Sequence, residues 1–173
     1  MTRTHTLAVA VLGLWIGWTL FMWFLAGRSF STVDGVLNKQ DKQFAAATQS
    51  MTPENTRLAL RYLASEINRK IFSAYGYGGI VLGIFLVFLV AKQTPRDKFS
   101  VTLAAGMLVI VLVLALIVTP QIISIGRSID FVPRNPPPPG FRRFWMLHGA
   151  FTLLDGTKLL AGLVLLGRWI WKA

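Results

Sequence analysis

Four long apolar stretches limit what this chain can fold into more than any other feature of its sequence. They cover about residues 7–26, 71–91, 99–123 and 144–167. A helix of roughly 20 apolar residues crosses the hydrocarbon core of a bilayer, which is about 30 Å thick. Backbone groups in lipid must find their hydrogen bonds within the segment, so such stretches form helices. The sequence therefore predicts an all-α fold, a single four-span integral membrane domain over residues 1–173 built as a four-helix bundle.

Composition agrees with this class and excludes several others. Only 14% of the residues are charged and 54% are hydrophobic, whereas a soluble domain carries about 25% charged residues. The chain has no cysteine, which excludes thiol catalysis, disulfides and thiolate metal sites, and its two histidines alone cannot make a three- or four-ligand zinc centre. The sequence shows no nucleophile–base pair and no phosphate-binding glycine loop. We therefore predict that the protein is not an enzyme and has no metal site.

Residues 27–70, between the first two spans, carry the signature of an amphipathic helix. Thr52, Pro53 and Glu54 supply an N-cap, a proline at the first helical position and an acidic first turn, which favour a helix start. Apolar residues then recur at helical spacing, with basic residues between them. A basic amphipathic helix joined to a span lies most simply in the headgroup layer as an interfacial helix. Packing against the other loop or a partner protein is the equally weighted alternative.

Residues 127–143 join the third and fourth spans and are rich in proline. The uninterrupted run from Pro136 to Pro139 favours an extended polyproline II segment. We predict a stiff strap that acts as a spacer rather than as a recognition motif. Pro120, near the end of the third span, is expected to kink that helix or to mark where it leaves the membrane.

The fourth span differs from the others because Asp155 and Lys158 interrupt it near its middle. Each central charge costs roughly 2.5 to 3.5 kcal/mol on the membrane-insertion scale, while each Leu, Phe or Val contributes about −0.3 to −0.6 kcal/mol. Over the whole span, the total contribution of the Leu, Phe and Val residues and the total cost of the two charges nearly cancel. This helix is therefore expected to need partner helices, snorkelling by Lys158, or mutual neutralisation of the two charges.

His148, Thr152, Asp155 and Lys158 form a polar stripe along this span. Spacings of four and three put the first three residues on one helical face, with Lys158 about 60° to the side. Because burying an ionisable residue in a membrane is costly, such a residue marks a candidate functional site.

Three hypotheses compete for this stripe. In the first, Asp155 and Lys158 pair, His148 hydrogen-bonds another helix, and the stripe fixes the packing register. In the second, His148 and Asp155 exchange protons or cations in a small conduit. In the third, His148 is an axial ligand of a haem or chlorophyll-type pigment. The first is favoured, since one histidine and one acid per chain supply neither a complete ion path nor paired haem ligands.

Two glycine pairs, each one helical turn apart, predict close helix packing. Gly13 and Gly17 lie in the first span, and Gly79 and Gly83 lie in the second. Small residues at this spacing let helix backbones approach, which matters in lipid because no hydrophobic drive pulls helices together there. Packing within the bundle is favoured over specific homodimerisation.

The distribution of charge bears on orientation and partners. Most Lys and Arg residues outside the spans lie in residues 27–70 and 127–143, so the positive-inside rule places these two connections in the cytoplasm. The net charge of +11 is spread over both ends of the helices and matches no basic and aromatic binding motif. We therefore expect contacts with anionic lipid headgroups and no nucleic-acid partner.

Three motifs resemble the transmembrane protein 205-like family, a four-helix membrane domain without an established activity. They are Leu14-Trp15-Ile16-Gly17 with Phe21 to Phe24, Thr119-Pro120-Gln121-Ile122, and Phe144-Trp145-Met146-Leu147-His148-Gly149. The family pattern is an aromatic residue, two further residues, His-Gly and a later Asn. His148 and Gly149 match this pattern, while Asp155 and Lys158 depart from it. The resemblance implies a four-helix integral membrane protein, and with the compact size it places the chain in a prokaryotic inner membrane.

These features together predict a small non-enzymatic membrane protein, a scaffold or accessory subunit that packs with other integral membrane subunits of a larger complex. A four-helix bundle of this length encloses little volume for a substrate. No cofactor is predicted in general; if the complex is respiratory or photosynthetic, His148 and the tryptophans are the residues expected to contact a haem or chlorophyll-type pigment or a quinone. The alternative is a small transporter or channel element that uses the polar stripe.

Overall fold

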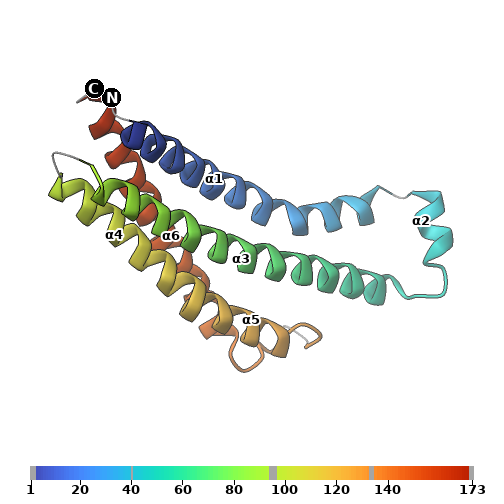
Figure 1. Cartoon of the computed structure of the whole chain (residues 1–173). Coiled ribbons are helices and arrows are strands. Elements are labelled where there is room, and N and C mark those ends of the chain that lie inside the picture. The colour runs from blue at the N-terminus through green and yellow to red at the C-terminus, as the bar shows by residue number, and fades with distance from the viewer. Residues whose placement is uncertain (1–2, 40, 94–96, 133–134, 172–173) are drawn as a thin grey trace.

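The computed structural model describes residues 3–39, 41–93, 97–132 and 135–171 of the chain. Within these ranges the regular structure is helical and no strand is present (Figure 1). The elements are α1 (Arg3–Asn38), α2 (Lys42–Ala47), α3 (Pro53–Ala91), α4 (Lys98–Val113), the π-helical turn η1 (Leu114–Val118), α5 (Thr119–Ser128) and α6 (Phe141–Trp171). The predicted all-α class is thus confirmed for the described part of the chain.

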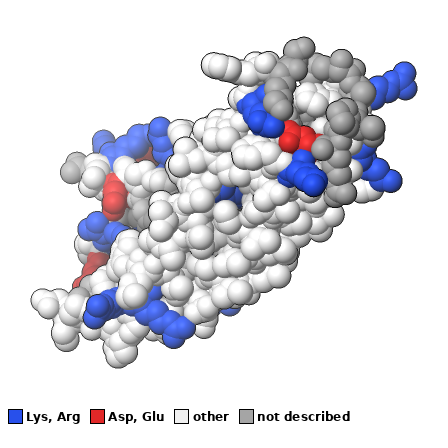
Figure 2. All heavy atoms as spheres, turned by 90° about the vertical axis from the view of Figure 1, so that its left-hand side faces the viewer, with Lys and Arg blue, Asp and Glu red and all other residues white. Residues whose placement is uncertain are grey.

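Four helical segments are long and apolar enough to cross a membrane. They are α1, α3, α6 and the continuous run of α4, η1 and α5 from Lys98 to Ser128. α1 packs against α3 and α6, and α4 packs against the same two helices, so successive segments alternate in direction around a bundle (Figure 1). On the face drawn in Figure 2, a broad band made almost entirely of uncharged residues separates the charged groups at its two ends. Length and composition therefore support the predicted multi-pass membrane architecture.

Helices α1 and α3 continue well past their apolar stretches. α3 has 39 residues and is about 58 Å long at 1.5 Å per residue, nearly twice the thickness of the hydrocarbon core. It begins as predicted, because Thr52 Oγ1 accepts a hydrogen bond from the Asn55 N–H at 3.2 Å and Pro53 is its first residue. Residues 27–38, predicted to be part of a loop, are the last turns of α1. A long α1–α3 hairpin, closed by α2, therefore projects beyond the spans (Figure 1).

The amphipathic helix predicted in residues 27–70 is present and, as predicted, runs into the second span, while its place in the headgroup layer stays a prediction. The basic amphipathic segment is the first half of α3 and runs without a break into the second span, because no proline or glycine interrupts it between Glu54 and Tyr75. It lies along the end of α1, where Ser29 Oγ donates to Asn68 Oδ1 at 2.7 Å. An ion pair of 3.0 Å between Arg57 and Asp34 joins the same two helices nearer the tip.

The third span continues past Pro120, and the connection after it is shorter than predicted. Pro120 does not end the helix, because the π-helical turn η1 precedes it and the Thr119 N–H bonds to the carbonyl of Leu114, five residues back. The helix therefore continues to Ser128, and α6 begins at Phe141, so the strap predicted over 127–143 is shorter at both ends. Pro133 lies outside the described residues. Pro138 is buried, and its carbonyl accepts the Phe141 N–H at 3.1 Å at the start of α6.

Glycine packing is confirmed in α3 and wrong in α1. A Cβ atom added at Gly79 would lie 2.8 Å from Val111 Cγ2, and one added at Gly83 would lie 2.8 Å from Trp15 Cη2. A Cβ at Gly13 or Gly17 would meet no atom within 4 Å. The reason is the register of α1, whose inward face is formed by larger residues: Ala8, Leu12, Trp15, Thr19 and Met22. Gly13 and Gly17 therefore face away from the bundle.

Candidate functional site

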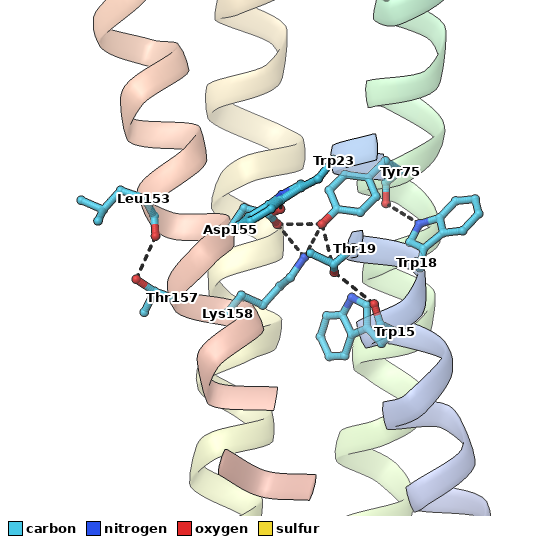
Figure 3. Close-up of polar contacts among 9 residues, drawn as sticks. All are labelled: Trp15, Trp18, Thr19, Trp23, Tyr75, Leu153, Asp155, Thr157 and Lys158. Atoms are coloured by element: carbon cyan, nitrogen blue, oxygen red, sulfur yellow. Dashed lines mark hydrogen bonds and ion pairs between the residues drawn. The ribbon is translucent and has the colours of Figure 1, made fainter. Parts of the chain in front are cut away.

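A group of polar side chains lies inside the bundle and is the strongest candidate for a functional site. Its members are Thr19 and Trp23 from α1, Tyr75 from α3, and Asp155 and Lys158 from α6 (Figure 3). We call these five residues the buried polar cluster. Asp155 and Lys158 are 0% and 1% exposed, respectively, while the Trp23 ring covers the cluster from the outside and is 42% exposed. The cluster therefore joins three helices at a point closed to solvent.

Both oxygens of the Asp155 carboxylate are hydrogen-bonded. Oδ1 accepts from Lys158 Nζ at 2.6 Å and from the Tyr75 hydroxyl at 2.7 Å. Oδ2 accepts from Trp23 Nε1 at 2.7 Å. Lys158 Nζ also donates to the Tyr75 oxygen at 2.6 Å (Figure 3). The ion pair predicted between the two charges of the fourth span is thus confirmed, and Tyr75 bridges it.

Aromatic rings and a hydroxyl complete the surroundings of Lys158. Its ammonium nitrogen lies 4.7 Å from the centre of the Tyr75 ring and 5.8 Å from that of Trp15, distances at which the ring faces attract a cation. Thr19 Oγ1 lies 3.2 Å from the Tyr75 hydroxyl, and Thr19 donates to the Trp15 carbonyl at 3.0 Å. The charge of the ammonium is therefore balanced by one carboxylate, one hydroxyl oxygen and two ring faces.

Burial makes this cluster sensitive to the loss of any one partner. Removing two charges from water costs several kcal/mol for each ion, and the cost is offset only when geometry is good and every hydrogen bond is made. Removing one partner of such a pair costs about 3–5 kcal/mol, because an uncompensated charge stays behind. The cluster thus forces α1, α3 and α6 into one relative position. Such a network fixes the packing register, as the favoured sequence hypothesis requires.

The predicted polar stripe does not stay together in the structure. Asp155 and Lys158 join the buried polar cluster, whereas Thr152 is exposed and donates to the carbonyl of His148 at 3.0 Å. His148 is half-buried, and its Nδ1 lies 2.9 Å from the carbonyl of Phe144 on its own helix, so the predicted bond to another helix is wrong. Seven residues separate His148 from Asp155, a rise of about 10 Å. At that height His148 lines a cavity instead of joining the cluster.

The partners of the ion pair escaped prediction from the sequence. Tyr75 and Thr19 lie far from Asp155 in the chain, and only the fold brings them together. One signal was present, because a tyrosine hydroxyl or a tryptophan N–H inside an apolar stretch needs a polar partner. Tyr75 and Trp23 carry such groups within or beside the predicted spans.

A second set of charges lies at the end of the spans that faces the α1–α3 hairpin. Arg69 on α3 bonds to Glu66 and forms an ion pair with Asp130 at 2.7 Å. Arg127 lies 3.5 Å from Glu66. We call Glu66, Arg69, Arg127 and Asp130 the Arg69 cluster. It ties α3 to the end of α5 and to the connection between α5 and α6, and its two positive and two negative charges cancel.

The Arg69 cluster has its own effect on protonation. The hydrogen bond from Arg69 holds the pKa of Glu66 below its usual value of 4.5, with a further contribution from Arg127. Burial works against the charge of Arg69, but the hydrogen bonds to Asp130 and Glu66 outweigh it and raise the pKa of Arg69. Both groups therefore stay charged at neutral pH.

Two hollows adjoin this cluster. The first, which we call the His148 cavity, has a volume of about 150 Å³ and lies between α1, α3, α5 and α6. The second, which we call the α3–α5 groove, has a volume of about 510 Å³ and runs between α3 and the η1–α5 segment. Neither hollow is lined by Asp155 or Lys158. Both therefore lie apart from the buried polar cluster.

The side chains and the size of the His148 cavity limit which cofactors the chain can hold. Within residues 3–39, 41–93, 97–132 and 135–171, no group of three His, Cys, Asp or Glu residues could hold a metal ion. A cavity of 150 Å³ holds a molecule of benzene size, which is far smaller than the four-pyrrole ring of a haem or a chlorophyll. The residues of the His148 cavity thus do not fit such a pigment. Axial ligation by His148 stays a prediction only for a pigment held outside the cavity.

Fold and site together describe a multi-pass α-helical chain with four candidate membrane spans. No protein-family model matches it, and neither does any curated protein or any solved structure. The resemblance to the transmembrane protein 205-like family stays a prediction from three sequence motifs. What the chain does is therefore inferred from the geometry of its own residues.

Proposed function

We propose that the protein is a non-enzymatic integral membrane protein, a scaffold or accessory subunit of a larger membrane complex. The observation that supports this most is the closure of the buried polar cluster. Transport was predicted to use His148, Asp155 and Lys158; of these, Asp155 and Lys158 are buried, with both carboxylate oxygens and the ammonium hydrogen-bonded to neighbouring side chains. A group that fixes three helices in register serves a structural protein directly.

The same geometry weighs against a transporter or channel element. Transport needs ionisable groups that meet water or substrate alternately from the two sides of a membrane. Asp155 and Lys158 are at most 1% exposed, and neither hollow reaches them. Protonation of Asp155 would also weaken its ion pair with Lys158 and the hydrogen bonds that it accepts from Tyr75 and Trp23.

The outer surface suits partners in and near the membrane. Large apolar side chains on all four spans face outward, among them Leu14, Val81, Val109 and Leu160, each more than half exposed. The basic residues beyond the spans suit anionic lipid headgroups. Our proposal includes the orientation expected from the charges, with residues 27–70 and 127–143 in the cytoplasm of a prokaryotic cell, and other integral membrane subunits as partners.

The proposal is tested by comparing assembly and flux in one pair of variants. Gentle solubilisation, native electrophoresis and mass spectrometry should find the full chain in a complex of fixed composition. The purified chain in proteoliposomes with a pH-sensitive dye should show no proton flux above empty vesicles. Asp155→Asn combined with Lys158→Met should leave flux at that level, and Asp34→Asn with Arg57→Met is the matched control, since it neutralises an exposed ion pair instead.

Two outcomes would overturn the proposal. One is proton or cation flux through the wild-type chain and the control that the Asp155→Asn, Lys158→Met variant lacks while it keeps its helical circular dichroism. The other is a chain that migrates alone after solubilisation in several mild detergents.

A further inference from the structure

We infer that the His148 cavity binds the ring of a neutral single-ring amphiphile of the quinone and quinol class, with its tail in the α3–α5 groove. This inference rests on the two hollows and not on the proposed function. The cavity lies at the level where α1 and α3 part from α5 and α6, at the membrane boundary. Residues from all four helices line it.

Size and walls fit one flat ring. The volume of about 150 Å³ equals that of an engineered cavity that accepts benzene. Phe72, Phe144 and Phe151 supply phenyl rings to its wall, and aromatic rings pack well against a flat ring in offset or edge-to-face contacts. A ring with small substituents fills this space, whereas a fused four-ring sterol does not.

The polar groups of the cavity lie on α3, α5 and α6, and two of them, Asn68 and His148, can bond to a quinone or quinol ring. Nδ1 of His148 lies 2.9 Å from the Phe144 carbonyl oxygen, which can only accept. In the tautomer with its proton on Nδ1, this nitrogen donates to the carbonyl and Nε2 is an acceptor. Asn68 on α3 uses its oxygen to accept from Ser29, which leaves its amide N–H groups as donors. A quinol hydroxyl can therefore donate to His148, while a quinone oxygen can accept from Asn68.

The balance of charge favours a neutral headgroup over a phosphate. Among the described residues that line the cavity, Arg69 is the one Lys or Arg, and its guanidinium is engaged by the carboxylates of Glu66 and Asp130. Together with Arg127, these groups sum to no net charge. An anionic lipid headgroup would have to displace a carboxylate to reach Arg69, whereas a neutral ring leaves the Arg69 cluster intact.

The α3–α5 groove supplies the place for a tail. It shares Phe72, Thr119 and Ile123 with the cavity, so the two hollows adjoin along one seam. From there the groove extends to Tyr77 and Ala115, which lie further along the second and third spans toward the middle of the bilayer. A ring at the boundary with a tail running inward is the usual disposition of a membrane amphiphile.

A pair of matched threonines allows a sharp test. Thr152 and Thr157 are both exposed on α6, and each donates to the carbonyl four residues before it. Thr152 lines the cavity, whereas Thr157 bonds to Leu153 on the side of α6 away from Tyr75 (Figure 3). Thr152→Phe should therefore obstruct the cavity, and Thr157→Phe adds the same ring elsewhere on the same helix.

The probe is a benzoquinol with a ten-carbon alkyl tail, titrated by calorimetry into the full chain in lipid nanodiscs. We expect saturable binding to the wild type at one site per chain, in excess of partitioning into empty nanodiscs. Thr152→Phe should weaken binding about tenfold or more, and Thr157→Phe should leave it unchanged. His148→Phe keeps a ring but removes the acceptor, so it should weaken binding about five- to tenfold.

Three results would overturn the inference. They are the absence of saturable binding to the wild type, equal weakening by Thr152→Phe and Thr157→Phe, and binding of dodecyl phosphate in the same titration with an affinity equal to that of the quinol. The last result would assign the cavity to a phosphate headgroup. Circular dichroism and thermal melting of each variant show that the chain is still folded, and a pair of smaller substitutions, Thr152→Leu and Thr157→Leu, replaces the first if Thr152→Phe does not fold.

Discussion

The buried polar cluster and the Arg69 cluster both join helices through ion pairs, yet they differ in what surrounds the charges. In the buried polar cluster a single pair, Asp155 and Lys158, is enclosed by Tyr75 and by tryptophan rings. In the Arg69 cluster charge is balanced by more charge, and Glu66 keeps 24% of its side chain exposed. Attraction between charges is weak in water and strong in a low dielectric. Loss of one partner is therefore expected to cost more stability in the first cluster than in the second, where water and salt can reach the charges.

The largest effect that this contrast predicts is for Lys158→Met alone. It leaves the Asp155 carboxylate buried without its cation, which should lower the free energy of unfolding by about 3–5 kcal/mol. Combining it with Asp155→Asn should restore much of that loss, because the amide can still bond to Tyr75 and Trp23. Reversible unfolding in sodium dodecyl sulfate measures the free energy of unfolding of the single and the double variant. A single variant no less stable than the double variant would show that the two charges do not depend on one another.

A smaller effect is expected from Tyr75→Phe. The variant removes the hydroxyl that bridges Asp155 and Lys158 but leaves their direct bond, so it should cost about 1–3 kcal/mol. The same unfolding titration measures it, with Tyr77→Phe as the control, since Tyr77 is 62% exposed. Equal stabilities of Tyr75→Phe and Tyr77→Phe would show that the Tyr75 hydroxyl does not stabilise the cluster.

Arg69→Met should cost about 1–2 kcal/mol, less than Lys158→Met, because water can reach part of the carboxylates that it leaves unpaired. The cost should also shrink in high salt, while that of Lys158→Met should not. Unfolding titrations at two salt concentrations test this difference. A salt-independent loss would mean that Arg69 is as enclosed as Lys158.

The smallest effect concerns pH. The folded-state pKa of Glu66 lies below its ordinary value of 4.5 because of the hydrogen bond from Arg69. Its contribution to stability is therefore fully present above about pH 4.5 and is lost as the pH falls through the lower folded-state pKa. Thermal melts between pH 7 and pH 3 should show a decline that Glu66→Gln lacks in this window. Identical pH profiles for the wild type and Glu66→Gln would show that ionisation of Glu66 does not affect the stability of the fold.

Local sequence patterns predicted the features that depend on neighbouring residues alone. Long apolar runs predict helices, Thr52 and Pro53 predict where α3 begins, and a spacing of three predicts the bond between Asp155 and Lys158. These patterns did not predict that α1 and α3 extend beyond the spans, because propagation of a helix depends on the tertiary contacts that its extra turns find. Two nearly identical glycine motifs behave differently for the same reason, since only the register of Trp15 against Gly83 decides which pair faces inward. The role of Tyr75 in the ion pair and the presence of the His148 cavity both depend on how several helices are placed. They therefore could not be predicted from local sequence patterns.

Side-resolved thiol labelling tests the sealed, four-span arrangement most directly, and the natural absence of cysteine makes it clean. Single variants Ser50→Cys, Lys92→Cys and Thr19→Cys are placed in the α1–α3 hairpin, the α3–α4 connection and the buried polar cluster. In sealed vesicles a charged maleimide should label Ser50→Cys and Lys92→Cys from opposite sides, and Thr19→Cys from neither side until the chain is denatured. Labelling of the first two from one side, or of Thr19→Cys in the intact membrane, would contradict the arrangement.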